Sequence, residues 1–144
     1  MSKLLTTITL LCFSVGAIAQ DQEVWGCQQE ASAGLFWENN RWRTGGVLPE
    51  TLLLKIPTEP SITLNDVYTI RDNATVKRGA DKEEAIFCRE ATLGFISCTT
   101  SLGSQLYLLN RNNGRLGYAT ILGALMDRGG RDTVANFIYN CTKF

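Results

Sequence analysis

The stretch LYLLNRNNGRLGY, residues 106–118, decides the fold class that we predict for this chain of 144 residues. Asn113 and Gly114 tolerate positive φ, and the apolar runs on both sides of them are typical of the two strands of a β-hairpin. The spacing of Asn110, Asn112 and Gly114 also resembles a calcium-binding loop. Such a loop needs acidic oxygens and a Glu at its last position, whereas the ligands here would be neutral amides and two arginines intrude. The stretch therefore predicts a hairpin tip and no metal ion.

The same kind of pattern continues along the chain on both sides of this hairpin. Short segments rich in Val, Ile, Thr and aromatic residues alternate with turn residues about every eight to twelve positions, and helical periodicity is weak. This predicts an all-β fold, a small antiparallel β-barrel or sandwich with meander topology. One short helix is predicted at residues 80–87, which are rich in Ala, Glu and Lys. The predicted strands cover residues 24–37, 51–56, 66–71, 86–89, 94–100, 105–110 and 133–144.

Small and turn-forming residues punctuate these segments. Residues 31–34 are all small, and they predict a bend or bulge within the first strand. An alternative for residues 119–126 is a second short helix. The predicted turns and loops are at residues 38–40, 72–73, 78–79 and 126–132.

The first nineteen residues have the composition of a secretory signal peptide. Lys3 gives a positive start, residues 4–18 are mostly apolar, and Ala17-Ile18-Ala19 places small residues at a cleavage site. The apolar run is shorter than the ~20 residues that span a bilayer, which weighs against a retained membrane anchor. We therefore predict a signal peptide at 1–19 and a single β-rich domain at 20–144 that is periplasmic or secreted. We expect no stable membrane insertion after the leader is removed.

The cysteines support export. Removal of Cys12 with the leader leaves an even set, Cys27, Cys88, Cys98 and Cys141, as expected in an oxidising compartment. Four cysteines allow three pairings. We favour a local Cys88–Cys98 bridge and a Cys27–Cys141 bridge that ties the two ends of the domain together. A zinc site is the competing use of four thiols, but the chain has no CxxC spacing and no histidine.

The composition excludes several classes of function. Because histidine is absent, the chain has no Ser-His-Asp or Cys-His nucleophilic site, no His-ligated zinc and no His general base. After loss of Lys3, thirteen basic residues stand against fourteen acidic ones, and the bases are scattered. Such a surface has no basic stripe that could follow a phosphate backbone. We predict no cofactor and no nucleic-acid partner.

The segment FWENNRW, residues 36–42, is the best candidate for a binding site. Trp37 and Trp42 bracket a turn and could form a cross-strand aromatic pair, while Arg41 and Arg43 add bidentate hydrogen-bond donors. Trp and Arg together are typical of interface hot spots and of platforms for sugars or peptides. The alternative is that one or both tryptophans plug an end of the barrel, because Trp is highly buried on average.

Two other functions stay open at this point. Glu30 and Glu38 could form the acid and base of a carboxylate-dependent hydrolase, although most Glu side chains are simply solvated. A hollow apolar barrel would instead carry a small apolar ligand. Asn73 and Asn140 lie in N-glycosylation sequons, which matter only if the source is a eukaryote.

Two segments carry a resemblance to known proteins: CQQEASAGLFWENNRW, residues 27–42, and the closing YNCTKF, residues 139–144. With these segments the chain resembles small exported bacterial proteins of unknown function. Those proteins have a cysteine near the mature start, an S-A-G-L-x-W-E segment, a middle pair of cysteines and a last strand with a final cysteine. The chain is also similar, more loosely, to periplasmic lysozyme-inhibitor barrels, although their inhibitory loop is not recognisable here. The first resemblance implies a bacterial envelope setting and brings no catalytic residue.

Taken together, these features predict an exported binding protein rather than an enzyme. Its ligand would be a partner protein, a peptide or a cell-wall fragment, and an inhibitor-like or immunity-like role is one form that this binding could take. The expected binding residues are Trp37, Arg41, Trp42 and Arg43.

Overall fold

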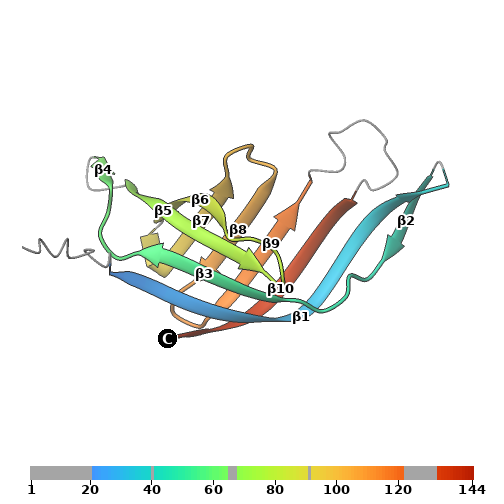
Figure 1. The fold of residues 1–144 in the computed structure, drawn as a ribbon, viewed down its shortest axis with the longest axis horizontal. Helices are drawn as coiled ribbons and strands as arrows, with labels where there is room; N and C mark the ends of the chain where they lie inside the picture. The colour runs from blue at the N-terminus through green and yellow to red at the C-terminus, as the bar shows by residue number, and fades with distance from the viewer. Residues whose placement is uncertain (1–20, 40, 65–67, 91, 122–132) are drawn as a thin grey trace, which may run out of the picture.

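The computed structural model describes residues 21–39, 41–64, 68–90, 92–121 and 133–144. Eight antiparallel strands form a barrel in which each strand pairs with the next and the last strand, β10, pairs back onto β1 (Figure 1). Closure of this kind removes the free edges that an open sheet would have. Outside this circuit, β2 extends β1 and β4 pairs with β5. The elements are β1 (Gln22–Glu38), β2 (Arg41–Gly45), β3 (Thr51–Pro57), β4 (Ile62–Leu64), β5 (Tyr68–Arg78), β6 (Glu84–Glu90), η1 (Thr92–Gly94), β7 (Phe95–Thr100), β8 (Gln105–Asn110), β9 (Arg115–Thr120) and β10 (Thr133–Lys143).

The all-β prediction is confirmed, and the barrel alternative is the correct one. The predicted signal peptide at 1–19 and the predicted turn at 126–132 lie outside the described residues, and so does most of the alternative helix at 119–126. Of the described residues of that segment, 119–121, the first two belong to strand β9.

Alternation of buried and exposed residues along each strand builds the core. On β10, Phe137 and Tyr139 point into the barrel and Ile138 points out. Four rings stack inside the barrel from β8 to β10, with centroid separations of 4.6 Å for Tyr107–Tyr118, 5.0 Å for Tyr118–Phe137 and 6.3 Å for Phe137–Tyr139. The interior between these strands is therefore a packed aromatic core.

Both predicted disulfides are present. Cys27 of β1 is directly opposite Cys141 of β10, and Cys88 of β6 is directly opposite Cys98 of β7, with a Cα–Cα distance of 4.0 Å in each pair. The first bridge fastens the seam at which the first and last strands of the barrel meet. The second bridge fastens a local hairpin.

The predicted helix at residues 80–87 is wrong. A turn at Gly79, which has a positive φ, leads into β6, where Ile86 and Cys88 are buried and Phe87 is exposed. The burial of alternate residues and the pairing of Cys88 with Cys98 favour a strand more strongly than the helix propensity of Ala, Glu and Lys favours a helix.

The predicted loop at residues 72–73 is also wrong. These residues lie inside β5, where the pairing with β6 shifts register between Arg71 and Ala74 and Asn73 adopts a φ of 62°. The turn signal of Asp and Asn here produces a β-bulge, because an Asn tolerates positive φ within a strand that stays paired on both sides of it.

The two hairpins that the sequence predicts most strongly are confirmed. Asn110 pairs with Arg115 across the tip of the β8–β9 hairpin, where Gly114 has a φ of 69°. A Cβ on Gly114 would lie 2.3 Å from the carbonyl oxygen of Cys141, so this position has room for glycine alone. The β1–β2 hairpin turns between Glu38 and Arg41, as predicted.

A bulge in β1 decides which way the rest of that strand faces. Gln29 is opposite Tyr139 and Ala31 is opposite Ile138, so Glu30 is the extra residue. The small residues after Glu30 fit the predicted bend. Because one residue is inserted, the inward positions change from odd to even numbers along β1, and Trp37 is carried to the outer face.

Candidate functional site

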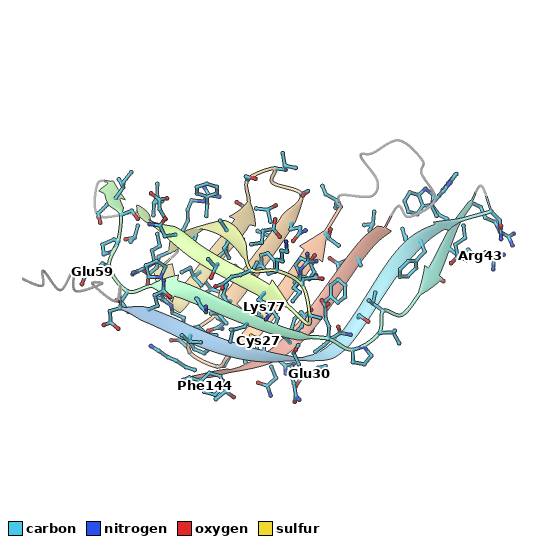
Figure 2. All side chains as sticks on the ribbon, viewed as in Figure 1. Cys27, Glu30, Arg43, Glu59, Lys77 and Phe144 are labelled. Atoms are coloured by element: carbon cyan, nitrogen blue, oxygen red, sulfur yellow. A yellow bond between two sulfur atoms is a disulfide. The ribbon has the colours of Figure 1, made fainter. Side chains whose placement is uncertain are left out.

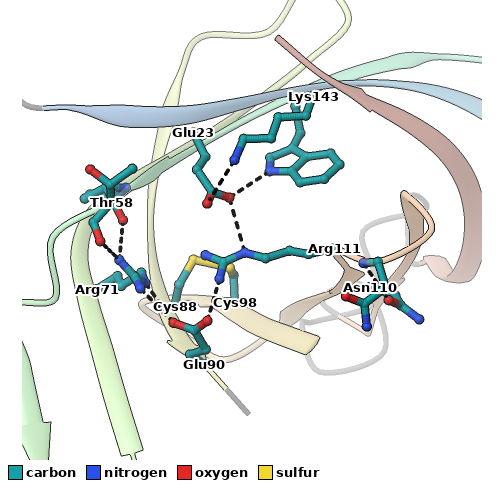
Figure 3. Close-up of polar contacts among 12 residues, drawn as sticks. Glu23, Thr58, Arg71, Cys88, Glu90, Cys98, Asn110, Arg111 and Lys143 are labelled. Carbon is teal, nitrogen blue, oxygen red and sulfur yellow. Dashed lines mark hydrogen bonds and ion pairs between the residues drawn. A yellow bond between two sulfur atoms is a disulfide. The ribbon is translucent and has the colours of Figure 1, made fainter. Parts of the chain in front are cut away.

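One end of the barrel is filled by charged side chains that form ion pairs with each other. Glu23 accepts a hydrogen bond from Trp25 Nε1 at 3.2 Å and lies 3.2 Å from both Arg111 Nε and Lys143 Nζ (Figure 3). Glu90 accepts a hydrogen bond from Arg71 Nη2 at 2.7 Å and also forms an ion pair with Arg111. We call this network of Glu23, Arg71, Glu90, Arg111 and Lys143 the ionic end.

The ionic end is a structural feature of the barrel. Arg71 is buried and also donates to the backbone carbonyls of Pro57 and Thr58, so it joins the ends of β3, β5 and β6. Burial by itself raises the pKa of Glu23, but the hydrogen bonds from Trp25 and Lys143 and the charges of Arg111 and Lys143 outweigh it, and the net pKa is lowered. The carboxylate of Glu23 is therefore held ionised by partners inside the chain.

The opposite part of the interior carries polar groups above the aromatic stack. Arg78 donates to the hydroxyl of Tyr118 at 3.0 Å, Tyr139 donates to Glu50 at 2.9 Å, and Tyr107 donates to Gln105 at 2.7 Å. Burial raises the pKa of all three tyrosines above the ordinary value. These three hydroxyls are neutral, and each of them has a hydrogen-bond partner. None of them is therefore a candidate for a general base.

The predicted binding segment forms a hairpin that projects beyond the barrel. Figure 1 shows β2 and the second half of β1 reaching away from the other strands, and Figure 2 places Arg43 at the far end of the molecule. All five residues of β2 are exposed, and Trp42 keeps 41% of its surface accessible. The tryptophans therefore do not plug the end of the barrel, and that alternative is wrong.

The predicted pairing of the two tryptophans is confirmed. Trp37 is directly opposite Trp42, and their ring centroids lie 5.4 Å apart at an interplanar angle of 69°. This edge-to-face arrangement is one of the two that aromatic quadrupoles favour. The pair holds two large rings in a fixed orientation near the tip of the hairpin.

The hairpin places its tryptophans and arginines on opposite faces. Trp37 and Trp42 occupy one face, whereas Arg43 is opposite Phe36 and Arg41 is opposite Glu38 on the other. The sequence predicted a single site in which the four residues act side by side. The geometry corrects this expectation, since a flat partner can cover the tryptophan face without contacting the arginine face.

The tryptophan face continues onto the outer wall of the barrel without a charged residue. The register links Leu108, Gly117, Ile138 and Ala31 in one row, and further rows lead from there to the hairpin. Leu35, Leu106, Leu108 and Ile138 each keep more than two fifths of their surface accessible. We call this surface the apolar face; it consists of Ala31, Ala33, Leu35, Trp37, Trp42, Thr44, Leu106, Leu108, Gly117, Ala119, Val134, Asn136 and Ile138.

Sequence reasoning missed the part of this face that lies on β8 to β10. The available signal was the run LYLLN, which has leucines at the outward as well as the inward positions of a strand. A strand with one solvated face normally alternates apolar and polar residues, so leucines at outward positions are a signal of an exposed apolar patch.

Glu30 and Glu38 do not form a catalytic pair with each other. Glu30 is bound to Arg115 at the bulge, and Glu38 lies at the end of the same strand. Eight residues of extended chain separate them by about 25 Å, whereas the two carboxylates of a glycosidase lie within about 10 Å. The carboxylate-dependent hydrolase therefore has no support from this pair.

The β8–β9 tip holds its polar groups by local hydrogen bonds. Asn110 accepts from the backbone N–H of Asn112, Asn112 donates to the carbonyl of Leu93, and Asn113 accepts from the backbone of Arg115. Across the described ranges, no group of three or more Cys, Asp or Glu side chains is arranged to hold a metal ion. In the same part of the chain, no helix has the length and apolar character needed to cross a membrane.

Comparison with known proteins gives no relative: no family model, no curated protein and no solved structure matches this chain.

Proposed function

We propose that the protein is a binding module that recognises a partner protein through the apolar face, with Trp37 and Trp42 as the central contacts. One observation carries this proposal: a paired, partly exposed set of tryptophans projects from the barrel and continues into an uncharged outer wall. Large apolar patches are rare on soluble monomers, and Trp is enriched among the residues that contribute most to binding at protein interfaces.

The composition of the apolar face favours a protein over a sugar or a charged ligand. Asn136 and Thr44 are its only polar side chains, so a hydroxyl-rich ligand would lose hydrogen bonds to water without replacing them. The packed stack of Tyr107, Tyr118, Phe137 and Tyr139 in the barrel likewise gives no support to a carrier of small apolar ligands.

The setting of this function is part of the proposal. Two disulfides join neighbouring strands of the barrel, and such bridges persist in oxidising compartments. We propose that the protein acts in the periplasm or outside the cell. A mass spectrum of the working molecule, with and without reductant, should give residues 20–144 with four oxidised cysteines.

Photocrosslinking from adjacent positions on opposite faces of β2 tests the recognition surface. Thr44 lies on the tryptophan face and Arg43 lies on the other. Both residues are exposed and belong to the same strand, so a benzoylphenylalanine at one position is a matched control for the other. In source cells, position 44 should give one discrete adduct and position 43 none. Equal adducts at both positions, or none at either, would overturn the proposal.

The adduct partner, once identified and purified, allows a quantitative test. Trp42→Ala should weaken binding at least tenfold, as expected for a central Trp, and Arg43→Ala should change it less than threefold. A larger loss for Arg43→Ala than for Trp42→Ala would assign recognition to the opposite face of the hairpin.

A further inference from the structure

A groove on the outer wall of the barrel lies apart from the apolar face. It spans β10, β1, β3 and β5 and has a volume of about 470 Å³. The register places Thr142, Gly26, Leu53 and Lys77 in one row along its floor. Asn140, Gln28 and Thr51 form the next row. Arg115 is opposite Asn140 at the end of this second row, and its ion pair with Glu30 separates the row from the apolar face.

The absence of a side chain at Gly26 makes the groove possible. A Cβ at this position would lie 2.6 Å from Cε2 of Phe144, whose ring rests on the glycine. The backbone N–H of Phe144 donates to the carbonyl of Val24 at 2.9 Å, which fixes the start of this residue beside β1. Phe144 as a residue is 81% exposed, so one wall of the groove is an aromatic side chain open to solvent (Figure 2).

The lining chemistry of the groove restricts its ligand. The amides of Gln28 and Asn140 both donate and accept hydrogen bonds, and the hydroxyls of Thr51 and Thr142 do the same. Lys77 supplies one cation, and the lining residues include no Asp or Glu side chain. A purely apolar ligand would leave the amides unpaired, and a nucleotide would need more than one positive charge for its phosphates.

An extended peptide is a poor match for the same site. Peptides that bind sheets do so by pairing with a free edge, but β1 is paired at this level with β10 on one side and β3 on the other. The ligand must therefore be recognised by side chains alone. These side chains carry hydroxyl and amide groups and lie beside an aromatic ring.

We infer that this groove binds a short saccharide that carries a carboxylate. Its hydroxyls pair with Gln28, Asn140 and the two threonines, one sugar face lies on the ring of Phe144, and the carboxylate lies at Lys77. This inference does not depend on the proposed protein partner, because the two surfaces share no residue.

Chemical shift mapping of the full domain tests the inference with three defined probes. Trigalacturonic acid and the disaccharide of N-acetylglucosamine and N-acetylmuramic acid carry carboxylates, and chitotriose is neutral. We expect at least one acidic probe, at a concentration below about 10 mM, to shift the signals of Gly26 and of the side-chain amides of Gln28 and Asn140. No shift of these signals with any probe up to about 20 mM would overturn the inference.

Matched variants separate the groove from nonspecific binding. Lys77→Gln should weaken binding of the acidic probe about three- to fivefold. Lys55→Gln removes the same charge from β3 outside the groove and should leave this binding unchanged. Phe144→Ala should weaken it about fivefold, whereas Phe87→Ala, an exposed ring on β6, should not. Equal effects of Lys77→Gln and Lys55→Gln would overturn the site.

Gly26→Ala provides a geometric test. Gly26 is not among the positive-φ residues, so an alanine is tolerated by the backbone, but its Cβ must displace the Phe144 ring. Binding of the acidic probe should fall at least fivefold while the unfolding transition stays in place. Unchanged binding in this variant would contradict the assigned position of the sugar.

Discussion

The two ends of the barrel differ in whether their large side chains are buried or exposed. At the ionic end, Arg71 and Glu90 are largely buried and meet partners from the same chain. At the other end, β1 leaves the barrel and holds Trp37 and Trp42 against each other on a projecting hairpin. This difference separates the residues that stabilise the barrel from those that we propose for recognition. Substitutions at the ionic end should therefore lower stability, and substitutions at the hairpin should weaken binding.

Loss of the Cys27–Cys141 bridge should be the largest effect on stability. It closes 114 residues of chain, and the loop-entropy relation gives about 5 kcal/mol for it, against about 3 kcal/mol for Cys88–Cys98, which closes 10. Denaturant unfolding of the two paired Cys→Ser variants measures both values. A smaller loss for the long bridge than for the short one would show that the seam between β1 and β10 does not depend on it.

Arg71→Met should destabilise the barrel by about 3 kcal/mol, because it leaves Glu90 with one partner fewer and removes the donor to Pro57 and Thr58. The matched control is Arg115→Met, which breaks an exposed pair with Glu30 and should cost less than about 1 kcal/mol. Similar losses for the two variants would mean that burial does not set the strength of the ionic end.

Acid should weaken the ionic end through Glu23. The folded-state pKa of Glu23 is lowered below its ordinary value of 4.5, so its contribution is complete above that pH and is lost as the pH falls through the lower folded value. The free energy of unfolding, measured between pH 7 and pH 3, should fall for the wild type in this range. Glu23→Gln should be less stable at pH 7 and should approach the wild type near pH 3; a constant difference would contradict this assignment.

Much of the barrel could be predicted from the sequence because its signals are local. Alternation on β10, the Asn-Gly tip after β8 and the cysteine set each specify a feature within a few residues, and tertiary structure agrees with them. The segment at 80–87 failed because helix propensity is weaker than the burial of Ile86 and Cys88 in a strand.

The surfaces were harder to predict because they depend on register. The bulge at Glu30 shifts the rest of β1 by one residue and turns Trp37 to the outer face, and the pairing of Trp37 with Trp42 then puts Arg43 on the other face. The groove joins Gly26, Leu53, Lys77 and Thr142, which are neighbours only after four strands have paired. No spacing in the sequence brings these residues together.

The most direct test of this division is the unfolding free energy of the double variant Trp37→Thr/Trp42→Thr, compared with Leu54→Ala in the core. Leu54 is completely buried, and its truncation should cost about 3 kcal/mol. The double variant should stay within about 1 kcal/mol of the wild type, because the hairpin pair packs outside the barrel. A loss as large as that of Leu54→Ala would show that the tryptophans belong to the folding core and would contradict the account.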